Sequence, residues 1–571
     1  MVGMGLAYAL FLILLAGFLG GFLAKRLRQP LILGYILAGI VVGALALPVV
    51  SNEEAVKTLA EIGVALLMFA LGIEFSLARL RRVKEIALWG GLIQILLTIL
   101  LGLFIFPQFG FDFYSSLFMA AAFSLSSTAV VTKLLSEKGE IDSLPGEIMV
   151  GWLLIQDLAV LPMLAILPKV AVLETSQFWR ILLSVGESAL LLVLVIILGK
   201  GVITKILDRI AAVGSRELLL LSVVTLCLAA AFGTYSLGLS FALGAFLAGL
   251  IVAESSQNHA IFSEIRPLRD VFVIIFFVSL GMMITPSFIL TNLLTILALV
   301  AIILSVKFLI VLGLVFYLGY HTKTAFLVAV GLVQVGEFSF VLARTGISQG
   351  VIGGEIYNFI IAVALVTIVF TPLLFEMAPR IYQRVRKLTG KKFPRLYSLI
   401  FTRFDHRQGQ EGLPLENHVI ICGYGRVGGW LGRALEMVGI PFVVVDYNFK
   451  IIKELKEKGT PVVYGDPGDV DVLSAAQAKK AKSVIIAIPD RRTQELVISN
   501  CQTLNPQLAI ICRTHHEEDQ PRLKALGVKA IIQPEFEASL SMIHRVLQTY
   551  GLEKEEVAGK IKRIKIEHGM G

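Results

Sequence analysis

The sequence contains a long series of apolar segments, and this feature restricts the fold more than any other. From position 1 to about 379, stretches of about 20 mostly apolar residues follow one another with few charges inside them. Only 16% of the chain is charged, against about 25% in ordinary soluble domains. From Arg380 onward the composition is that of a soluble protein. The chain therefore divides into a membrane part and a part exposed to water.

The membrane part is long enough for thirteen spanning helices. The loops between them alternate in basic residues, because one set carries sixteen Lys and Arg residues and the other carries four. Basic loops remain in the cytoplasm, so we expect an N-terminus outside, a cytoplasmic C-terminal domain and a location in the plasma (inner) membrane. The predicted spans are 5–24, 31–50, 55–76, 85–107, 114–134, 147–170, 179–199, 216–234, 238–254, 268–284, 288–319, 323–344 and 355–377.

Three ionisable residues lie well inside predicted spans, where an unpaired charge is costly. Asp157 is near the middle of 147–170, Lys307 is near the middle of 288–319, and Glu337 lies inside 323–344. We expect Asp157 and Lys307 to form an ion pair. Pairing would lower the pKa of a buried carboxylate and burial would raise it, so such a group can exchange a proton for a cation. A static pair that holds two helices together is the alternative.

Two predicted spans carry signs of an interrupted helix. Segment 114–134 contains four hydroxyl residues between Ser124 and Thr128, followed by a β-branched run, and segment 323–344 has Gly331 and Gly336 on either side of Gln334. Interrupted helices in corresponding halves are typical of the binding site of inverted-repeat transporters. The four cysteines show no metal-ligand spacing, and we expect no metal beyond a transported monovalent cation.

These residues resemble the cation:proton antiporter-2 superfamily, and within it the Kef-type potassium/proton antiporters. The resemblance covers nearly the whole membrane part and is carried by Ser126–Val131, Gln156-Asp157-Leu158, Lys307 and Gly336-Glu337-Phe338. It implies a polytopic all-α membrane domain of about thirteen helices, with inverted repeats, two broken crossing helices and alternating access. Sodium-specific relatives often carry a second acid where this chain has Gln156, which favours potassium here. The residues expected to act in ion and proton transport are Asp157, Gln156, Lys307, Ser127, Thr128 and Glu337.

The soluble part contains a dinucleotide-binding pattern in its proper context. A buried strand over 417–422 leads into Gly423-Tyr424-Gly425-Arg426-Val427-Gly428, a helix follows, and a second strand ends in Asp446. Such glycines allow the backbone to approach phosphate, and the acid accepts ribose hydroxyls. We therefore expect an α/β Rossmann-like domain that prefers NAD or an adenosine nucleotide to NADP. The candidate binding residues are Gly423, Tyr424, Gly425, Arg426, Val427, Gly428, Asp446, Gly465 and Asp466.

This region resembles the N-terminal domain of regulators of potassium conductance, called RCK or TrkA-N-like domains. The resemblance implies NAD(H) or AMP as a regulatory ligand, with glutathione or its adduct as a further effector. Arg513, His515 and His516 lie near the expected cleft, where solvated loop residues are the alternative interpretation. We expect a transmembrane domain at 1–379, a basic cytoplasmic linker at 380–415, a nucleotide-binding domain at 416–540 and a charged tail at 541–571.

The combination predicts a monovalent cation/proton antiporter, not an enzyme, that is regulated by a cytoplasmic nucleotide. Potassium efflux in exchange for protons is favoured, and sodium/proton exchange is the alternative. A nucleotide-gated potassium channel is disfavoured, because the chain has no Thr-Val-Gly-Tyr-Gly-like filter. An NAD-dependent oxidoreductase would need a substrate domain, and only about 30 residues follow position 540. The expected partners are the ions, the bilayer, a second copy of the chain and an ancillary regulatory subunit, with no nucleic acid.

Overall fold

The structure is a computed structural model that separates into two compact units. The first comprises Met1–Thr132, Ile148–Leu314 and Val328–Glu376, and the second comprises Lys133–Glu147, Val315–Leu327 and Met377–Gly571. The second unit thus contains two short segments of the predicted membrane part. The structure describes residues 2–27, 29–46, 53–74, 85–141, 143–172, 203–210, 213, 215–236, 241–253, 255, 258–282, 284, 286–392, 415–514 and 517–567.

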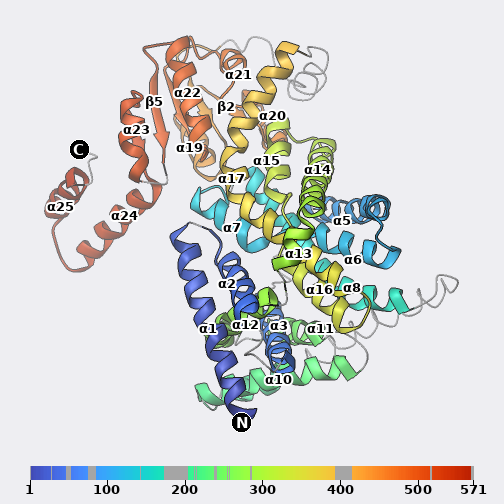
Figure 1. The fold of residues 1–571 in the computed structure, drawn as a ribbon. Coiled ribbons are helices and arrows are strands. Elements are labelled where there is room, and N and C mark those ends of the chain that lie inside the picture. The colour runs from blue at the N-terminus through green and yellow to red at the C-terminus, as the bar shows by residue number, and fades with distance from the viewer. Residues whose placement is uncertain are drawn as a thin grey trace. The chain divides into compact units, whose positions relative to one another are not determined.

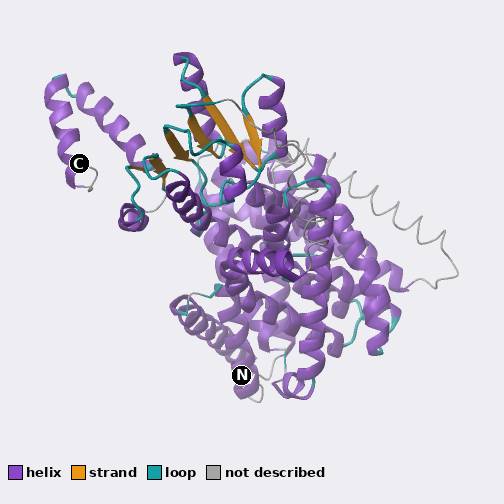
Figure 2. Ribbon diagram, turned by 90° about the horizontal axis from the view of Figure 1, so that it is seen from above, coloured by secondary structure: helices purple, strands orange, loops and turns teal. Residues whose placement is uncertain are grey.

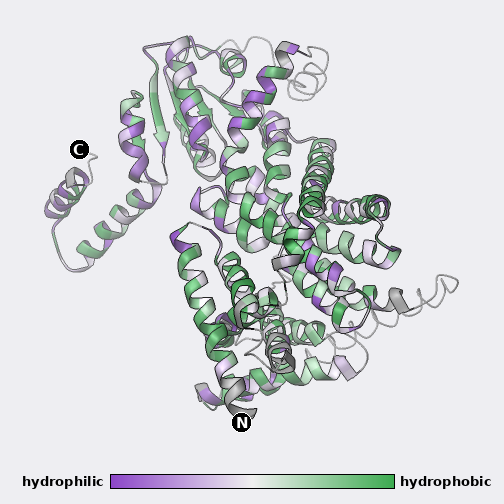
Figure 3. Cartoon of the chain, viewed as in Figure 1, coloured by the Kyte–Doolittle hydropathy of each residue, from purple (hydrophilic) through white to green (hydrophobic). Residues whose placement is uncertain are grey.

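The first unit is helical in every described element, apart from short connections (Figure 1). Its long helices are apolar along most of their length, as α14 illustrates in Figure 3, because polar and charged side chains are costly in lipid. The helices up to Lys392 follow, and five of them, α7, α8, α14, α15 and α17, extend into the second unit. They are α1 (Val2–Arg26), α2 (Leu31–Ala46), α3 (Glu53–Glu74), α5 (Glu85–Ile105), α6 (Phe113–Ser124), α7 (Thr128–Glu137), α8 (Leu144–Val172), α10 (Arg216–Ser236), α11 (Phe241–Ala253), α12 (Asn258–Met282), α13 (Pro286–Thr291), α14 (Leu293–Tyr317), α15 (Thr322–Leu332), α16 (Phe338–Ser348) and α17 (Gly354–Lys392).

Seven helical segments of the described chain are long and apolar enough to cross a bilayer, and four shorter apolar helices accompany them. The predicted number of thirteen spans is therefore not established. The predicted span 179–199, with Glu187, lies outside the described residues. Helix α17 continues to Lys392, so the first residues of the expected linker are helical, and residues 393–414 are not described.

Both helices with predicted interruptions are indeed broken. Helix α6 ends at Ser124 and α7 begins at Thr128, and Leu125 between them has an extended backbone. Helix α15 ends at Leu332 and α16 begins at Phe338. Each break leaves backbone N–H and C=O groups without partners in a helix, and these groups need partners elsewhere when they are buried.

The second unit is built on a six-stranded parallel sheet with strand order β3-β2-β1-β4-β5-β6, drawn in orange in Figure 2. The order reverses at β1, and ligands of such folds bind at the carboxyl ends of the strands beside this switch point. Buried aliphatic residues on both faces of the sheet form its core. The strands are β1 (Val419–Cys422), β2 (Phe442–Asp446), β3 (Val462–Tyr464), β4 (Ser483–Ile486), β5 (Ala509–Arg513) and β6 (Ala530–Ile532).

Helices connect the strands in the alternating order typical of a Rossmann-like domain. The fold class expected from the sequence, a helical membrane domain followed by an α/β domain, is confirmed. The connecting and terminal helices are α19 (Arg426–Val438), α20 (Phe449–Glu457), α21 (Val470–Ala475), α22 (Arg491–Leu504), α23 (Gln520–Ala525), α24 (Pro534–Thr549) and α25 (Lys554–Glu567).

Candidate ion site and nucleotide site

Two glutamine side chains satisfy the backbone between α6 and α7. Gln156 of α8 accepts the N–H of Ser126 through Oε1 at 2.7 Å. Gln334, in the break between α15 and α16, accepts the N–H of Ser127 at 2.9 Å and donates to the carbonyl of the same residue at 3.3 Å. All four side chains are buried. The side chains thus provide hydrogen-bond partners for the backbone groups of Ser126 and Ser127 without water. An interrupted helix can therefore exist inside the membrane part.

The two breaks also bond to each other directly. The Ser126 hydroxyl donates to the carbonyl of Leu332, and the N–H of Gly336 donates to the carbonyl of Leu125 at 3.0 Å. A Cβ atom at Gly336 would lie 2.5 Å from the carbonyl carbon of Ser126, so only glycine allows the two chains to approach this closely. The segments expected to line one site are therefore in contact.

Lys307 lies in this crossing, but it does not pair with Asp157 as we expected. Its ammonium donates to the carbonyls of Leu125 and Gln334, at 3.1 and 2.6 Å, and to the Ser126 hydroxyl at 2.9 Å. These three acceptors account for its partners among the described residues. The expected ion pair is wrong for this structure, because the carbonyls at the ends of the broken helices carry partial negative charge and bind the ammonium instead.

The carboxylate of Asp157, a residue of α8, lies at the N-terminus of the half-helix α7. The hydroxyl of Thr128, the first residue of α7, lies 2.9 and 3.1 Å from the two carboxylate oxygens and donates to the carboxylate. Asp157 is 8% exposed. A helix N-terminus favours a negative charge, so the position suits an ionised carboxylate that binds a cation or a proton.

Glu337 has a different environment from Asp157. It precedes α16 without capping that helix, and its Oε2 is buried with no hydrogen-bond partner among the described residues. The structure thus brings the six predicted transport residues to one crossing. Lys307, Gln156 and Ser127 hold the backbone, Asp157 pairs with Thr128, and the carboxyl group of Glu337 lies close to Ser127 and Ala129. Glu337 lies next to Gly336, at the edge of the same break.

Two residues of the crossing were missed in the sequence. The buried amide of Gln94 in α5 donates to the carbonyl of Ser124, and its Oε1 accepts from Gln156 at 2.6 Å. The hydroxyl of Thr367 in α17 accepts the N–H of Val335 at 3.1 Å. A glutamine and a threonine inside apolar spans were the available signal, but a neutral polar residue is often only a helix–helix contact.

In the second unit, the glycines of the turn between β1 and α19 have separate steric roles. Gly423 has φ 91°, which favours glycine, and a Cβ at Gly428 would lie 2.1 Å from the carbonyl oxygen of Gly423. A Cβ at Gly425 would meet nothing within 4 Å. The first and third glycines therefore shape the turn, and the second leaves open space at the N-terminus of α19, where an anion is favoured.

Asp446 ends β2 beside this turn. Its carboxylate accepts the N–H groups of Tyr424 at 2.7 Å and Asn448 at 2.8 Å. Burial raises the pKa of Asp446 above its ordinary value, although these two bonds act in the opposite direction. The carboxylate is thus fixed at the carboxyl end of β2, where a ribose would be recognised.

A cavity of about 300 Å³ lies against these residues. One wall comes from the connection between α7 and α8, through Gly139 and Ser143, and from the first turn of α8, through Leu144 and Glu147. The opposite wall comes from the Rossmann-like domain. Its members are Gly423, Gly425, Val427, Asp446, Tyr447, Asn448, Ile451, Ala487, Ile488, Pro489 and Arg513. The sequence did not predict the wall formed by 139–147.

The remaining candidate binding residues lie outside this lining. The N–H of Tyr424 is bound to Asp446, Gly428 packs beneath the turn, and Arg426 begins α19. Gly465 and Asp466 follow β3, and Asp466 binds the side chain of Lys323. Of the residues near the expected cleft, Arg513 lines the cavity, and His515 and His516 are not among the described residues.

Comparison with known proteins identifies both parts of the chain. Residues 10–376 match the family described as "Sodium/hydrogen exchanger, transmembrane", and residues 419–534 match the TrkA-N domain. The chain therefore belongs to the sodium/hydrogen exchanger family and carries a C-terminal TrkA-N domain. It is a multi-pass membrane antiporter of cations and protons with a cytoplasmic Rossmann-like domain.

Two relatives share this organisation over nearly the whole chain. The chain is 33% identical over 540 residues to the "Putative cation/proton antiporter YbaL" of Escherichia coli (strain K12), covering 93% of this chain and 95% of that protein. It is 29% identical over 526 residues to the "Putative K(+) efflux antiporter KefB" of Alkalimonas amylolytica, covering 92% and 78%. Among solved structures, the "Shewanella denitrificans Kef CTD in AMP bound form" is 26% identical with a TM-score of 0.24, covering 26% of this chain and 92% of that one.

Proposed function

We propose that the protein exports potassium in exchange for protons, with Asp157 as the residue that carries either ion. The position of Asp157 carries this proposal: the carboxylate is buried, it lies at the N-terminus of a broken half-helix, and the Thr128 hydroxyl donates to it. A single acid that binds a cation and a proton in turn couples their movements. Alternating exposure of this site to the two sides of the membrane, as in inverted-repeat transporters, then gives exchange.

Two observations support potassium as the cation. Position 156 is a glutamine whose side chain is bound to Ser126 and Gln94, so it adds no second charge that would favour a smaller cation. One relative over nearly the whole chain is named a putative potassium efflux antiporter. Sodium/proton exchange is the second candidate, because the matched family is that of sodium/hydrogen exchangers.

We further propose that a nucleotide in the 300 Å³ cavity regulates exchange. The open space at Gly425 suits a phosphate, and Asp446 suits ribose hydroxyls. Ligand pockets usually have volumes of about 300–1,000 Å³, so this one is at the small end of the range. That size favours a mononucleotide such as AMP, and NAD(H) is the alternative. A glutathione adduct remains a further candidate effector.

The proposed organisation keeps the boundaries derived from the sequence. The exchanger occupies 1–379 with thirteen spans and an external N-terminus, the linker occupies 380–415, the nucleotide-binding domain occupies 416–540 and the tail occupies 541–571. Two copies of the chain are proposed to form the transporter, with an ancillary subunit as a further partner.

Exchange by the purified protein in proteoliposomes tests the proposal. Internal pH is followed while gradients of potassium, sodium or rubidium are imposed, with and without AMP or NADH. We expect potassium to drive the largest proton movement and AMP to change its rate. A larger response to sodium would favour the second candidate, and equal rates with and without either nucleotide would refute regulation.

A further inference from the structure

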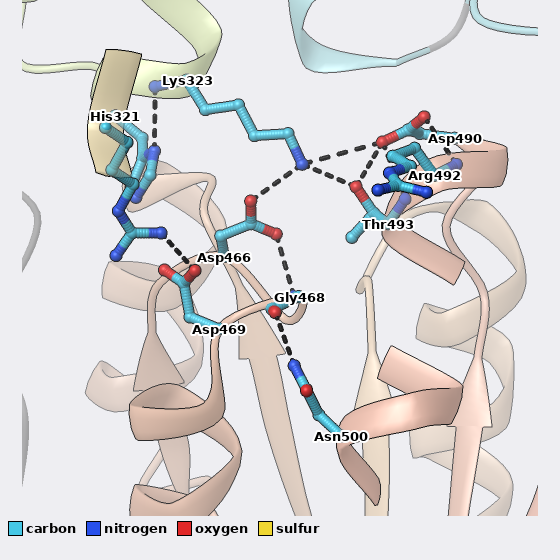
Figure 4. A network of polar contacts seen from close by, with 10 residues as sticks. His321, Lys323, Asp466, Gly468, Asp469, Asp490, Arg492, Thr493 and Asn500 are labelled. Atoms are coloured by element: carbon cyan, nitrogen blue, oxygen red, sulfur yellow. Dashed lines mark hydrogen bonds and ion pairs between the residues drawn. The ribbon is translucent and has the colours of Figure 1, made fainter. Parts of the chain in front are cut away.

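The side chain of Lys323 is buried in a network of acidic and hydroxyl groups of the nucleotide-binding domain (Figure 4). Lys323 is the second residue of α15, and its ammonium donates to Asp466 at 2.8 Å and to the Thr493 hydroxyl at 2.6 Å. The carboxylate of Asp490 is 3.7 Å away. The side chains of Lys323 and Asp466 are 9% and 6% exposed. All of these residues belong to the second unit.

The acidic partners of Lys323 are themselves fixed by the fold. Asp466 accepts the N–H of Gly468 at 3.0 Å, and the carbonyl of Gly468 accepts from Asn500. Asp490 caps the N-terminus of α22 by accepting the N–H groups of Arg492 and Thr493. Burial would raise the pKa of Asp466, but the nearby ammonium of Lys323 holds it below its ordinary value. The carboxylate is therefore charged and directed at Lys323.

Burial separates this ion pair from the ordinary surface pairs of the domain. Lys480 and Glu416 are similarly close, at 2.7 Å, but their side chains are 56% and 68% exposed. Exposed pairs contribute little, whereas removal of one partner from a buried pair leaves an uncompensated charge. A second bridge, between Arg386 of α17 and Asp469, lies beside the first. Two helices that continue from the exchanger are thus bound to the loop that follows β3.

Helix α15 connects this network to the crossing. Its eleven residues span about 16 Å. Its N-terminus is capped by His321, whose Nδ1 accepts the N–H of Lys323 at 3.2 Å. Its last residue, Leu332, accepts the Ser126 hydroxyl, and Gln334 two residues later binds Ser127. A shift of Lys323 along the helix axis therefore reaches Ser126 and Ser127, which directly precede Thr128, the partner of Asp157.

The same network of Lys323 is also connected to the proposed nucleotide cavity. Asp446 lines the cavity, and its carbonyl accepts the N–H of Gly465 at 3.1 Å. Gly465 is joined directly to Asp466. A ligand that moves the end of β2 therefore moves the carboxylate that holds Lys323.

We propose that Lys323 is a positioning residue through which the nucleotide-binding domain controls α15, with Asp466 as its partner. This proposal rests on the proposed nucleotide regulation. Asp466 thus recognises a side chain of the exchanger instead of the nucleotide. In the unliganded state the pair holds α15 in place and restrains exchange, and a ligand at Asp446 weakens that restraint. A ligand can shift such an equilibrium only through its different affinity for the two states.

The test compares Lys323→Met, which keeps the length but removes the charge, with Lys480→Met, which removes the exposed pair. The full-length proteins are measured in proteoliposomes for exchange with and without AMP, and in detergent for AMP binding. Coupling between sites usually amounts to about 5- to 150-fold, and we expect Lys323→Met to reduce the AMP response to less than about twofold while exchange without AMP rises. By the same linkage, Lys323→Met should bind AMP at least as tightly as the wild type, because no restraint opposes binding. Exchange by Lys480→Met and by Lys323→Arg should respond to AMP as the wild type does.

Each outcome separates this proposal from the regulation on which it rests. If wild-type exchange does not respond to AMP or NADH, regulation is refuted and this proposal with it. If the wild type responds and Lys323→Met responds equally, only the role of Lys323 is overturned. If Lys323→Met proves poorly folded, Asp466→Asn is measured in the same way, and a full response to AMP in that variant would also overturn the proposal.

Discussion

At the scale of single residues, the polar groups of the two helix breaks satisfy one another. Gln156 and Gln334 bind the N–H groups of Ser126 and Ser127, and Lys307 binds the carbonyls of Leu125 and Gln334. An unsatisfied group at this depth would cost several kcal/mol. The crossing is therefore one unit, in which loss of a single partner is expected to affect both broken helices.

Gly336→Ala tests the close approach of the two breaks. The added methyl group would lie within 2.5 to 2.8 Å of three backbone atoms of Ser126 and Ser127, and backbone cannot rotate away as a side chain can. We expect a loss of stability of at least about 2 kcal/mol, measured by thermal unfolding in detergent, and loss of exchange.

Gly313→Ala in α14 is the matched control, because a Cβ there meets nothing within 4 Å. It should be neutral or slightly stabilising, since alanine favours a helix by about 0.5–1 kcal/mol over glycine. Equal stability of the two variants would contradict the crossing described above.

Lys307→Met tests the hydrogen bonds that the buried ammonium group donates. The substitution leaves the buried carbonyl of Gln334 without a donor among the described residues, at about 1–3 kcal/mol. It also removes one of two bonds at the Leu125 carbonyl and at the Ser126 hydroxyl, which keep their bonds to Gly336 and Leu332. We expect a large fall in unfolding temperature and loss of exchange, and Leu309→Met, at an exposed position of the same helix, should change neither.

The double variant Lys307→Met/Asp157→Asn separates carbonyl binding from the ion pair that the sequence suggested. Removal of both charges would restore stability if the two residues stabilised each other. We expect no such recovery, because the carbonyl of Gln334 would still lack the donor that Lys307 provides.

Sequence reasoning found the ionisable residues of the crossing but not their partners. Asp157 and Lys307 are conspicuous because charges are rare in apolar spans. The partners of Lys307 are backbone carbonyls, which every residue carries, so no residue type marks them. The sequence therefore suggests Asp157 as the partner of Lys307, because it is a buried residue of opposite charge.

At the scale of elements, the segment between α7 and α8 is the least expected feature. It was predicted as a cytoplasmic loop. Through Ser143, and together with Glu147 in the first turn of α8, it forms a wall of the proposed nucleotide cavity. Helix α8 begins at Leu144 and carries Asp157 thirteen residues further on. The breaks in α6–α7 and α15–α16 could be predicted from serines and glycines, whereas long-range packing of a loop leaves no local pattern in the sequence.

Glu140 in this segment makes the unit sensitive to pH. Burial and the carboxylate of Asp490 raise the pKa of Glu140 from 4.5 to about 7, although Lys138 and Lys323 act in the opposite direction. A carboxyl with a raised pKa in the folded state contributes stability below its unfolded value, and this contribution is lost as pH rises through 7.

Glu140→Gln should therefore stabilise the full-length protein above pH 7 and have little effect near pH 4.5. We expect a gain of about 1–3 kcal/mol at pH 8, read from thermal unfolding at several pH values. Glu137→Gln, which removes an exposed pair with Lys133, serves as the control. A gain from Glu140→Gln that does not depend on pH would contradict the raised pKa of Glu140.

At the scale of the whole molecule, the division of the chain does not follow its sequence order. Segments Lys133–Glu147 and Val315–Leu327 of the exchanger cluster with the nucleotide-binding domain. The two classes of domain were evident from composition and from the glycine pattern at 423–428. Their clustering was not, because it depends on buried contacts such as Lys323 with Asp466, whose residues are far apart in the chain.

The central claim is that one carboxylate, Asp157, carries both ions. The most direct measurement is proton movement driven by a potassium gradient in proteoliposomes that contain Asp157→Asn, compared with the wild type. Asparagine keeps the size of the side chain and an acceptor for Thr128, so the variant should fold with a similar unfolding temperature. We predict that potassium-driven proton movement is abolished, whereas proton-coupled potassium exchange that persists in this folded variant would contradict the account.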